Sequence, residues 1–181
     1  MIKHALIFLS IFCLTAAHSQ AQSFELNKNE STVTYTLTHL LHVVDATSKD
    51  VAYHIDGNAA AKKINGVTAQ VDVTTFDSGN SNRDSHAMEV VDAITYPYTT
   101  FSSTSVTQLG DSLHITGKLT FHGITGDITM LGKAIWTEHR LEVQGNFVLS
   151  LTAYKVERPS LLMVPVNDDL HFALKAVFNI K

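Results

Sequence analysis

The stretch 113–123, LHITGKLTFHG, carries the pattern that decides the fold. Its odd-numbered positions are apolar or glycine and polar residues stand between them, the large apolar ones being Leu113, Ile115, Leu119 and Phe121. Successive side chains of a β-strand point to opposite faces of a sheet, so this alternation predicts a strand with one buried face. Gly123 then signals a reversal, because glycine tolerates the positive φ of a tight turn.

The same alternation recurs on both sides of this stretch. It is seen at 32–38, 51–56, 67–74, 141–150 and 170–179, and less regular strands are expected near 98–108 and 127–138. Turn signals such as Asn65-Gly66 and Gly110-Asp111 separate the strands at short intervals. Eight or nine strands, each with one apolar face, predict an all-β sandwich or an antiparallel barrel of about eight strands. Closure into a barrel is favoured because it removes exposed strand edges.

One segment, Arg83–Ile94, departs from alternation. Its apolar residues recur at helical spacing and are Ala87, Val90, Val91 and Ile94. Ser81 is the expected N-cap, with Asp84 three residues later, and Pro97 prevents continuation. We expect one amphipathic helix that covers one end of the barrel.

Residues 1–21 have the features of a secretory signal peptide. A short basic start precedes the apolar run 5–17, and Ser19-Gln20-Ala21 offers small residues for cleavage after Ala21, with Ala17 as the competing position. The run is shorter than the roughly 20 residues that a membrane span needs. We therefore predict one mature domain, residues 22–181, without an integral membrane segment, in the periplasm or outside the cell. Cys13, the sole cysteine, lies inside the predicted signal.

The charge pattern argues against nucleic acid as a partner. The chain has 13 basic and 17 acidic residues, a formal net charge of −4, and no basic block. The sequence leaves the oligomeric state open, a monomer and a dimer both being compatible with it.

The histidines are the obvious candidates for chemistry, yet their spacing does not support it. His39 and His42 resemble a ligand pair, but in an extended strand residues three apart point to opposite faces, and no Glu follows His39 as in zinc proteases. A polar cluster near the barrel mouth is the preferred interpretation. His86 follows Asp84 and Ser85 too closely for a triad, and no Gly-x-Ser-x-Gly elbow is present. We therefore expect no catalytic residues, metal or cofactor, and no enzymatic activity.

The interior is left open between a cavity and a filled core. Gly117, Gly132 and Gly145 fall in phase with the apolar faces of their strands. Small inward residues leave room for a ligand, but glycine in a strand also marks a bulge or a bend. Arg83 has two interpretations as well, either an ion pair with Asp84 that docks the helix or a contact to a ligand head group.

Two motifs resemble the YceI-like family. Asn82-Arg83-Asp84-Ser85-His86, with Tyr96-Pro97-Tyr98-Thr99-Thr100-Phe101, is similar to its central signature, and 117–126 is similar to its second one. Residues 157–162 resemble a segment of some members, and the likeness extends from about Ser23 to Lys181. Two departures concern the pore mouth: the loop 43–49 lacks the family's glycine-aromatic pair, and Gly126-Asp127 stands where many members carry a basic residue.

The resemblance implies a periplasmic or secreted, lipocalin-like antiparallel barrel with a helix at one end. It also implies binding of a long amphiphilic lipid, such as an isoprenoid, an isoprenoid quinone or a fatty-chain compound, for transport, storage or sequestration, without a general activity or metal. Arg83 is the head-group candidate, and the residues expected to line the pore are Tyr35, Leu37, Val71, Val73, Ile115, Leu119, Phe121, Met130, Trp136, Phe147, Leu149 and Phe172. The alternative is a filled barrel that acts as a non-catalytic interaction or stress protein of the envelope.

Overall fold

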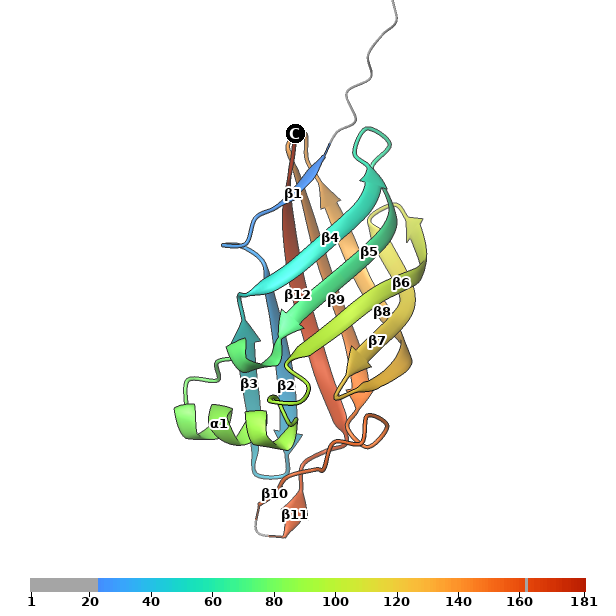
Figure 1. The fold of residues 1–181 in the computed structure, drawn as a ribbon. Helices are drawn as coiled ribbons and strands as arrows, with labels where there is room; N and C mark the ends of the chain where they lie inside the picture. The colour runs from blue at the N-terminus through green and yellow to red at the C-terminus, as the bar shows by residue number, and fades with distance from the viewer. Residues whose placement is uncertain (1–22, 162) are drawn as a thin grey trace, which may run out of the picture.

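The computed structural model describes residues 23–161 and 163–181, so the predicted signal peptide at 1–21 lies outside the described residues. Ten strands form one curled antiparallel sheet (Figure 1). Nine of them follow one another in the order β3 (His42–Ser48), β2 (Thr32–His39), β12 (Asp169–Ile180), β9 (Arg140–Ser150), β8 (Ile124–Trp136), β7 (Ser112–Phe121), β6 (Tyr98–Leu109), β5 (Lys63–Asp72) and β4 (Val51–Asn58). The tenth, β1 (Phe24–Leu26), pairs with β12 beyond the end of β2.

The remaining elements gather at one end of the sheet (Figure 1). They are the 3-10 turn η1 (Val73–Thr75), the helix α1 (Ser81–Val90), and a small hairpin of β10 (Ser160–Leu161) and β11 (Val164–Pro165). Among the described residues, no helix is long and apolar enough to cross a membrane.

The expected all-β antiparallel barrel with one helix is confirmed, in the form of a half-barrel. Strands β3 and β4 end the hydrogen-bonded order, and no ladder joins them within the described residues. The chain passes from β3 into β4 through Lys49 and Asp50, and Figure 1 shows β4 continuing upward from the end of β3 rather than folding back beside it. Side-chain and loop contacts bridge the seam instead: Tyr53 Oη donates to the Thr32 carbonyl at 3.1 Å, and Thr47 and Asp77 exchange backbone hydrogen bonds.

Two local expectations are corrected. Residues 43–49, expected to be a loop, form most of β3, because the polar and apolar side chains of this segment pair along β2 from His39↔His42 to Val33↔Ser48. The helix is shorter than Arg83–Ile94: Asn80, not Ser81, is its N-cap, and its side chain accepts from the backbone N–H groups of Asn82 and Arg83 at 3.1 Å each. Asp92, with a φ of 46°, ends the helical path, which leaves Ile94 exposed.

The inward glycines mark close strand contacts rather than free space. A Cβ at Gly117 would lie 2.6 Å from the Phe101 ring, and one at Gly145 would lie 2.8 Å from Met130 Sδ. Opposite Gly117, the β6–β7 register shifts between Ser103 and Ser105, as at a bulge. The bulge interpretation therefore holds for Gly117, whereas Gly132 and Gly145 pair with each other in regular register, with no bulge.

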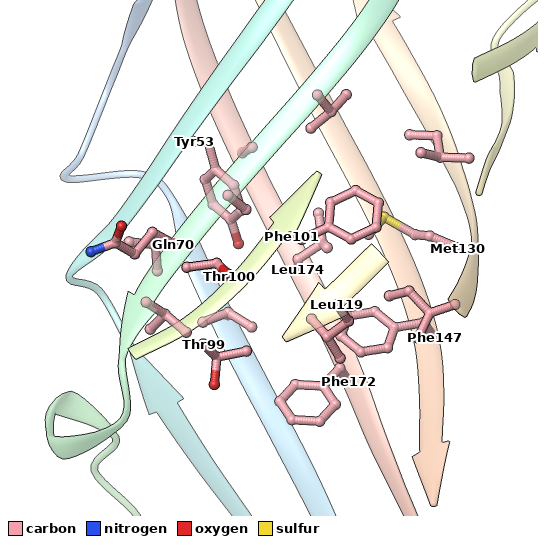
Figure 2. A pocket seen from close by; sticks show the side chains of 18 of the residues that line it. Tyr53, Gln70, Thr99, Thr100, Phe101, Leu119, Met130, Phe147, Phe172 and Leu174 are labelled. Carbon is pink, nitrogen blue, oxygen red and sulfur yellow. The ribbon is translucent and has the colours of Figure 1, made fainter. Parts of the chain in front are cut away.

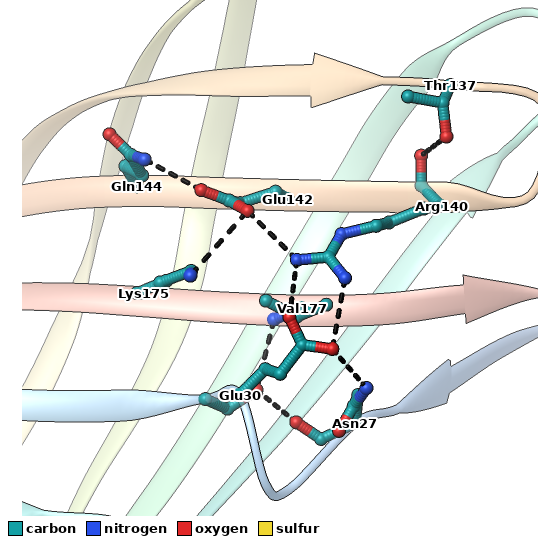
Figure 3. Close-up of polar contacts among 9 residues, drawn as sticks. Asn27, Glu30, Thr137, Arg140, Glu142, Gln144, Lys175 and Val177 are labelled. Atoms are coloured by element: carbon teal, nitrogen blue, oxygen red, sulfur yellow. Dashed lines mark hydrogen bonds and ion pairs between the residues drawn. The ribbon is translucent and has the colours of Figure 1, made fainter.

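A buried serine joins β1 and β2 to the same edge of β12. Between the two ladders, the Val177 N–H donates to Ser31 Oγ at 3.0 Å, and the Val177 carbonyl accepts from Asn27 N–H at 2.8 Å. Figure 3 shows how the intervening turn is also held from the side, where Arg140 donates to both carboxylate oxygens of Glu30 at 3.0 and 2.7 Å. These contacts lower the pKa of Glu30 below its ordinary value, with the Arg140 hydrogen bond as the largest cause.

We expect Ser31→Ala to lower the free energy of unfolding by about 1–3 kcal/mol, because it leaves the buried Val177 N–H without a partner. Urea unfolding followed by circular dichroism measures this loss. Ser105→Ala, at an exposed position of β6, is the matched control and should change little. Equal stability of the two variants would show that Ser31 does not complete the edge of β12.

Candidate functional site

Two adjacent cavities occupy the concave side of the half-barrel. The first has a free volume of about 80 Å³ and lies among inward side chains of strands β2, β4–β9 and β12. Figure 2 shows rings and aliphatic groups converging on this space, whereas Gln70, one of the labelled polar residues at its border, is exposed and points away from it. We call it the inner cavity.

The second, the mouth cavity, has a free volume of about 330 Å³ and lies beside α1, the β2–β3 hairpin and the segment 151–166. Its polar residues include Tyr35, His39, His42, Arg83, Asp84, His86, Thr99 and Ser160. Ligand cavities of this kind combine an apolar lining with a few polar groups that fix orientation. The mouth cavity therefore has polar groups at its rim, and the inner cavity has a mainly apolar lining.

Four side chains line both cavities and form the boundary between them: Val71, Thr99, Phe121 and Phe172. Phe172 is held by two aromatic contacts, a stacked one to Phe147 with centroids 4.8 Å apart and an edge contact to Tyr35 at 6.3 Å. A ligand that reached both cavities would pass between these four residues. We call them the constriction.

The structure brings together eleven of the twelve residues expected to line a pore. Ile115, Leu119, Met130, Phe147 and Leu149 line the inner cavity, Tyr35, Leu37 and Val73 line the mouth cavity, and Val71, Phe121 and Phe172 line both. Trp136 lies outside both linings, because it belongs to the far end of β8 and packs edge-on against Phe24 at 6.0 Å.

Sequence reasoning missed the parts of the mouth cavity that come from outside the alternating strands. Val44 is on β3, Phe76 follows η1, Met88 is on α1, and Leu151, Val156 and Val166 lie between β9 and β12. The signal that could have found the last three is the apolar content of 151–166, which is unusually high for an irregular connection.

Arg83 lines the mouth cavity, but it does not pair with Asp84 as one interpretation expected. Its guanidinium donates to Ser78 Oγ at 2.8 Å and to the Ser78 carbonyl at 2.6 Å, while Asp84 accepts from the Ser78 N–H and hydroxyl. Arg83 and Asp84 thus both hydrogen-bond to Ser78. These bonds connect the first turn of α1 to the loop that precedes it.

Tyr35, a half-buried residue of β2, brings a phenol hydroxyl to the lining of the mouth cavity. Burial raises the pKa of Tyr35 above its ordinary value, with a further contribution from the nearby Asp84 carboxylate. Tyr35 therefore stays a neutral phenol, which both donates and accepts hydrogen bonds.

His39 and His42 lie together, contrary to the expectation that they point to opposite faces. The β2–β3 turn places them directly opposite each other, with ring centroids 5.2 Å apart. His39 is buried; its Nδ1 accepts from the Leu41 N–H at 3.2 Å, so its Nε2 donates to the Val164 carbonyl at 3.0 Å. No cluster of three or more metal-ligating side chains occurs among the described residues.

Asp168 fastens the connection that closes one side of the mouth cavity. Its carboxylate accepts hydrogen bonds from Ser150 Oγ and from the Thr152 hydroxyl and N–H. These bonds, with that of Ser150 the largest cause, lower the pKa of Asp168 to about 2 from an ordinary 3.8. The turn that starts here carries Leu151, which lines the cavity.

This lowered pKa predicts an acid dependence of stability. Between pH 4 and pH 2, Asp168 is protonated in the unfolded chain but still ionised in the folded protein. Its contribution to the free energy of unfolding is therefore fully present above pH 4 and is lost as the pH falls through 2. We expect Asp168→Asn to flatten the thermal stability profile in this window, measured by calorimetry. Asp56→Asn, at an exposed position of β4, is the control. An unchanged profile in Asp168→Asn would contradict the prediction.

Comparison with known sequences agrees with the resemblance. The profile of the YceI-like domain matches residues 24–178. Protein YceI of Escherichia coli O157:H7 is 39% identical over 80 residues, which span 43% of this chain and 40% of that protein's own length. A UPF0312 protein of Pseudomonas putida is 25% identical over 178 residues, 92% of this chain and 93% of the relative.

Solved structures share the fold. BcnA of Burkholderia cenocepacia superimposes with a TM-score of 0.76 at 20% identity, over 84% of this chain and 99% of that one. A polyisoprenoid binding domain from Saccharophagus degradans, implicated in plant cell wall breakdown, gives a TM-score of 0.66 at 11% identity, over 89% and 99% of the two chains. At these identities the likeness concerns the half-barrel and its helix.

Proposed function

Since this chain belongs to the YceI-like domain family, we propose that its half-barrel binds one amphiphilic long-chain lipid of the isoprenoid, isoprenoid quinone or fatty-chain type. The observation that carries the proposal is the pair of adjacent cavities, with polar groups at the mouth and an apolar lining inside. The name of the Saccharophagus degradans relative supports an isoprenoid as one member of this ligand class.

The free energy of such binding would come from the tail. Each methylene moved from water into an apolar lining contributes about 0.8 kcal/mol, so a tail of ten carbons contributes about 8 kcal/mol and longer tails offset the cost of association further. The inner cavity, at about 80 Å³, is too small for a long tail by itself. A long tail would therefore fill both cavities and displace the constriction side chains, above all Phe172.

The head group would stay in the mouth cavity beside Tyr35 and Arg83. The neutral Tyr35 phenol can donate to a carbonyl or hydroxyl oxygen, and Arg83 can do so through guanidinium protons that Ser78 does not use. We propose a role in transport, storage or sequestration, without catalysis, in the periplasm or outside the cell.

The test is direct uptake. Protein stripped of lipid is mixed with dispersed polyprenol, isoprenoid quinone or fatty amide, each with a short-chain analogue, and bound mass is measured by native mass spectrometry. We expect one long-chain molecule per protein, and affinity that rises with tail length. No uptake of any long-chain compound, or equal uptake of the short analogues, would refute a tail-binding cavity.

A further inference from the structure

Two hairpins meet at the mouth and extend past α1 (Figure 1). They are the β2–β3 hairpin and the β10–β11 hairpin. His39 Nε2 contacts the Val164 carbonyl at 3.0 Å, and the Asn167 N–H donates to the Thr38 carbonyl at 2.8 Å. These bonds hold the two hairpins together as one protruding end of the molecule.

This end presents aliphatic side chains to solvent. The mouth patch, as we define it, consists of Leu40, Leu41, Val43, Met163 and Val164. Leu40 is 80% exposed and Met163 is 95% exposed, so their side chains add little to the packing of the fold. Leu40 and Leu41 also occupy a two-residue hairpin turn, where Asn and Gly are the residues that suit the backbone. Exposed apolar groups that gather in this way mark an interaction surface.

The two segments that carry the patch are poor in charge, and the nearest acidic residues along the chain, Asp45 and Glu157, lie just outside them. Neither 38–44 nor 158–166 contains Asp or Glu, although the whole chain carries more acidic than basic residues. The one fully charged residue in these two segments is Arg158, and its guanidinium donates inward to the Val166 carbonyl. A bilayer interface accepts aliphatic side chains and disfavours carboxylates, so this composition suits a lipid surface.

The patch is continuous with the mouth cavity. His39 and His42 flank Leu40 and Leu41 and line that cavity, as does Ser160 at the base of the other hairpin. We propose that the mouth patch inserts shallowly into an electrically neutral lipid surface and sets the cavity opening against the bilayer, where an amphiphilic lipid can enter or leave without crossing water. This inference rests on the proposed function and adds the membrane as its partner.

A lipid surface is favoured over a protein partner by the side chains themselves. Protein interfaces concentrate their binding energy in Tyr, Trp and Arg, whereas the patch consists of Leu, Val and Met. The net negative charge of the chain also argues against attraction to anionic head groups. Insertion driven by apolar contact should therefore persist on neutral vesicles and at high salt.

The experiment is flotation of lipid-free protein with vesicles of pure phosphatidylcholine. We expect the protein to float with the vesicles, equally at about 0.1 and 0.5 M NaCl. Leu40→Glu should lower the ratio of bound to free protein by about tenfold or more, and addition of Met163→Glu should bring it to background. The matched control is Leu109→Glu: Leu109 is 77% exposed but lies at the far end of β6, and this variant should change the ratio by less than about twofold.

Uptake of the same lipid by two routes separates this inference from the proposed function. The Leu40→Glu/Met163→Glu variant should still bind polyprenol added from ethanol, but it should acquire polyprenol from vesicles at least about tenfold more slowly. Wild-type protein that binds polyprenol but never floats with neutral vesicles overturns the inference alone. Flotation restricted to anionic vesicles also overturns it. So does a dimer of the wild type in sedimentation experiments, if Leu40→Glu dissociates this dimer into monomers. Failure of polyprenol binding by both routes refutes the proposed function.

Discussion

Val71→Trp is expected to abolish binding of long-chain lipids while the protein remains folded. Val71 lines both cavities from β5, so an indole at this position would fill the constriction and separate the inner cavity from the mouth. A tail excluded from the inner cavity loses the burial of several methylenes, which corresponds to an affinity at least about 100-fold weaker. Native mass spectrometry of polyprenol titrations measures this loss.

Two comparisons make the Val71→Trp result specific. Thr68→Trp adds the same ring to an exposed position of β5 and should bind polyprenol as the wild type does. A short-chain analogue that needs the mouth cavity alone should lose less affinity for Val71→Trp than the long chain does. Unchanged long-chain affinity in a folded Val71→Trp protein would mean that the tail does not pass the constriction.

The largest stability effect is expected from Leu141→Ala, with a loss of about 2–5 kcal/mol in the free energy of unfolding. Leu141 is fully buried on β9, between Trp136 of β8 and Phe178 of β12, and it lines neither cavity. Its truncation leaves a cavity among side chains that bury Leu141 completely. For a domain of this size the loss corresponds to a fall in Tm of very roughly 4–20 °C.

Leu131→Ala provides the matched control for this prediction. Leu131 is 56% exposed on the outer face of β8, so the same truncation should cost about 0.5 kcal/mol or less. Calorimetry of both variants in the absence of lipid gives the comparison. Similar Tm values for the two would contradict the close packing of Leu141 in the core.

The strand pattern could be predicted because one face of each long strand is buried. Alternation located β7, β9 and β12 within a few residues, since the apolar positions of a half-buried strand are fixed by the pleat. It missed β3, whose buried Val44, Ala46 and Ser48 face inward but are small or polar. The open seam also escaped prediction, because it depends on the direction in which the chain leaves Ser48.

The lining residues that lie on strands could be predicted from the sequence, whereas those in the connections between strands could not. Phe121 and Phe172 were expected to face inward from their strand phase, and they line both cavities. Trp136 had the same phase but lies beyond the cavities, because alternation gives the face of a residue and not its height along the barrel. The hydrogen bonds of Arg83 and Asp84 to Ser78 depend on the loop before α1, which no periodic pattern predicts.

The contents of the cavities in the protein's own cells test the central claim most directly. The protein would be purified from those cells without detergent, weighed by native mass spectrometry, and extracted with organic solvent. We predict a reproducible adduct of one molecule that extracts as a long-chain lipid and is lost in Val71→Trp but retained in Thr68→Trp. A bare protein mass in every preparation, with no uptake of polyprenol, quinone or fatty amide afterwards, would contradict the claim and favour a barrel that acts through its surface.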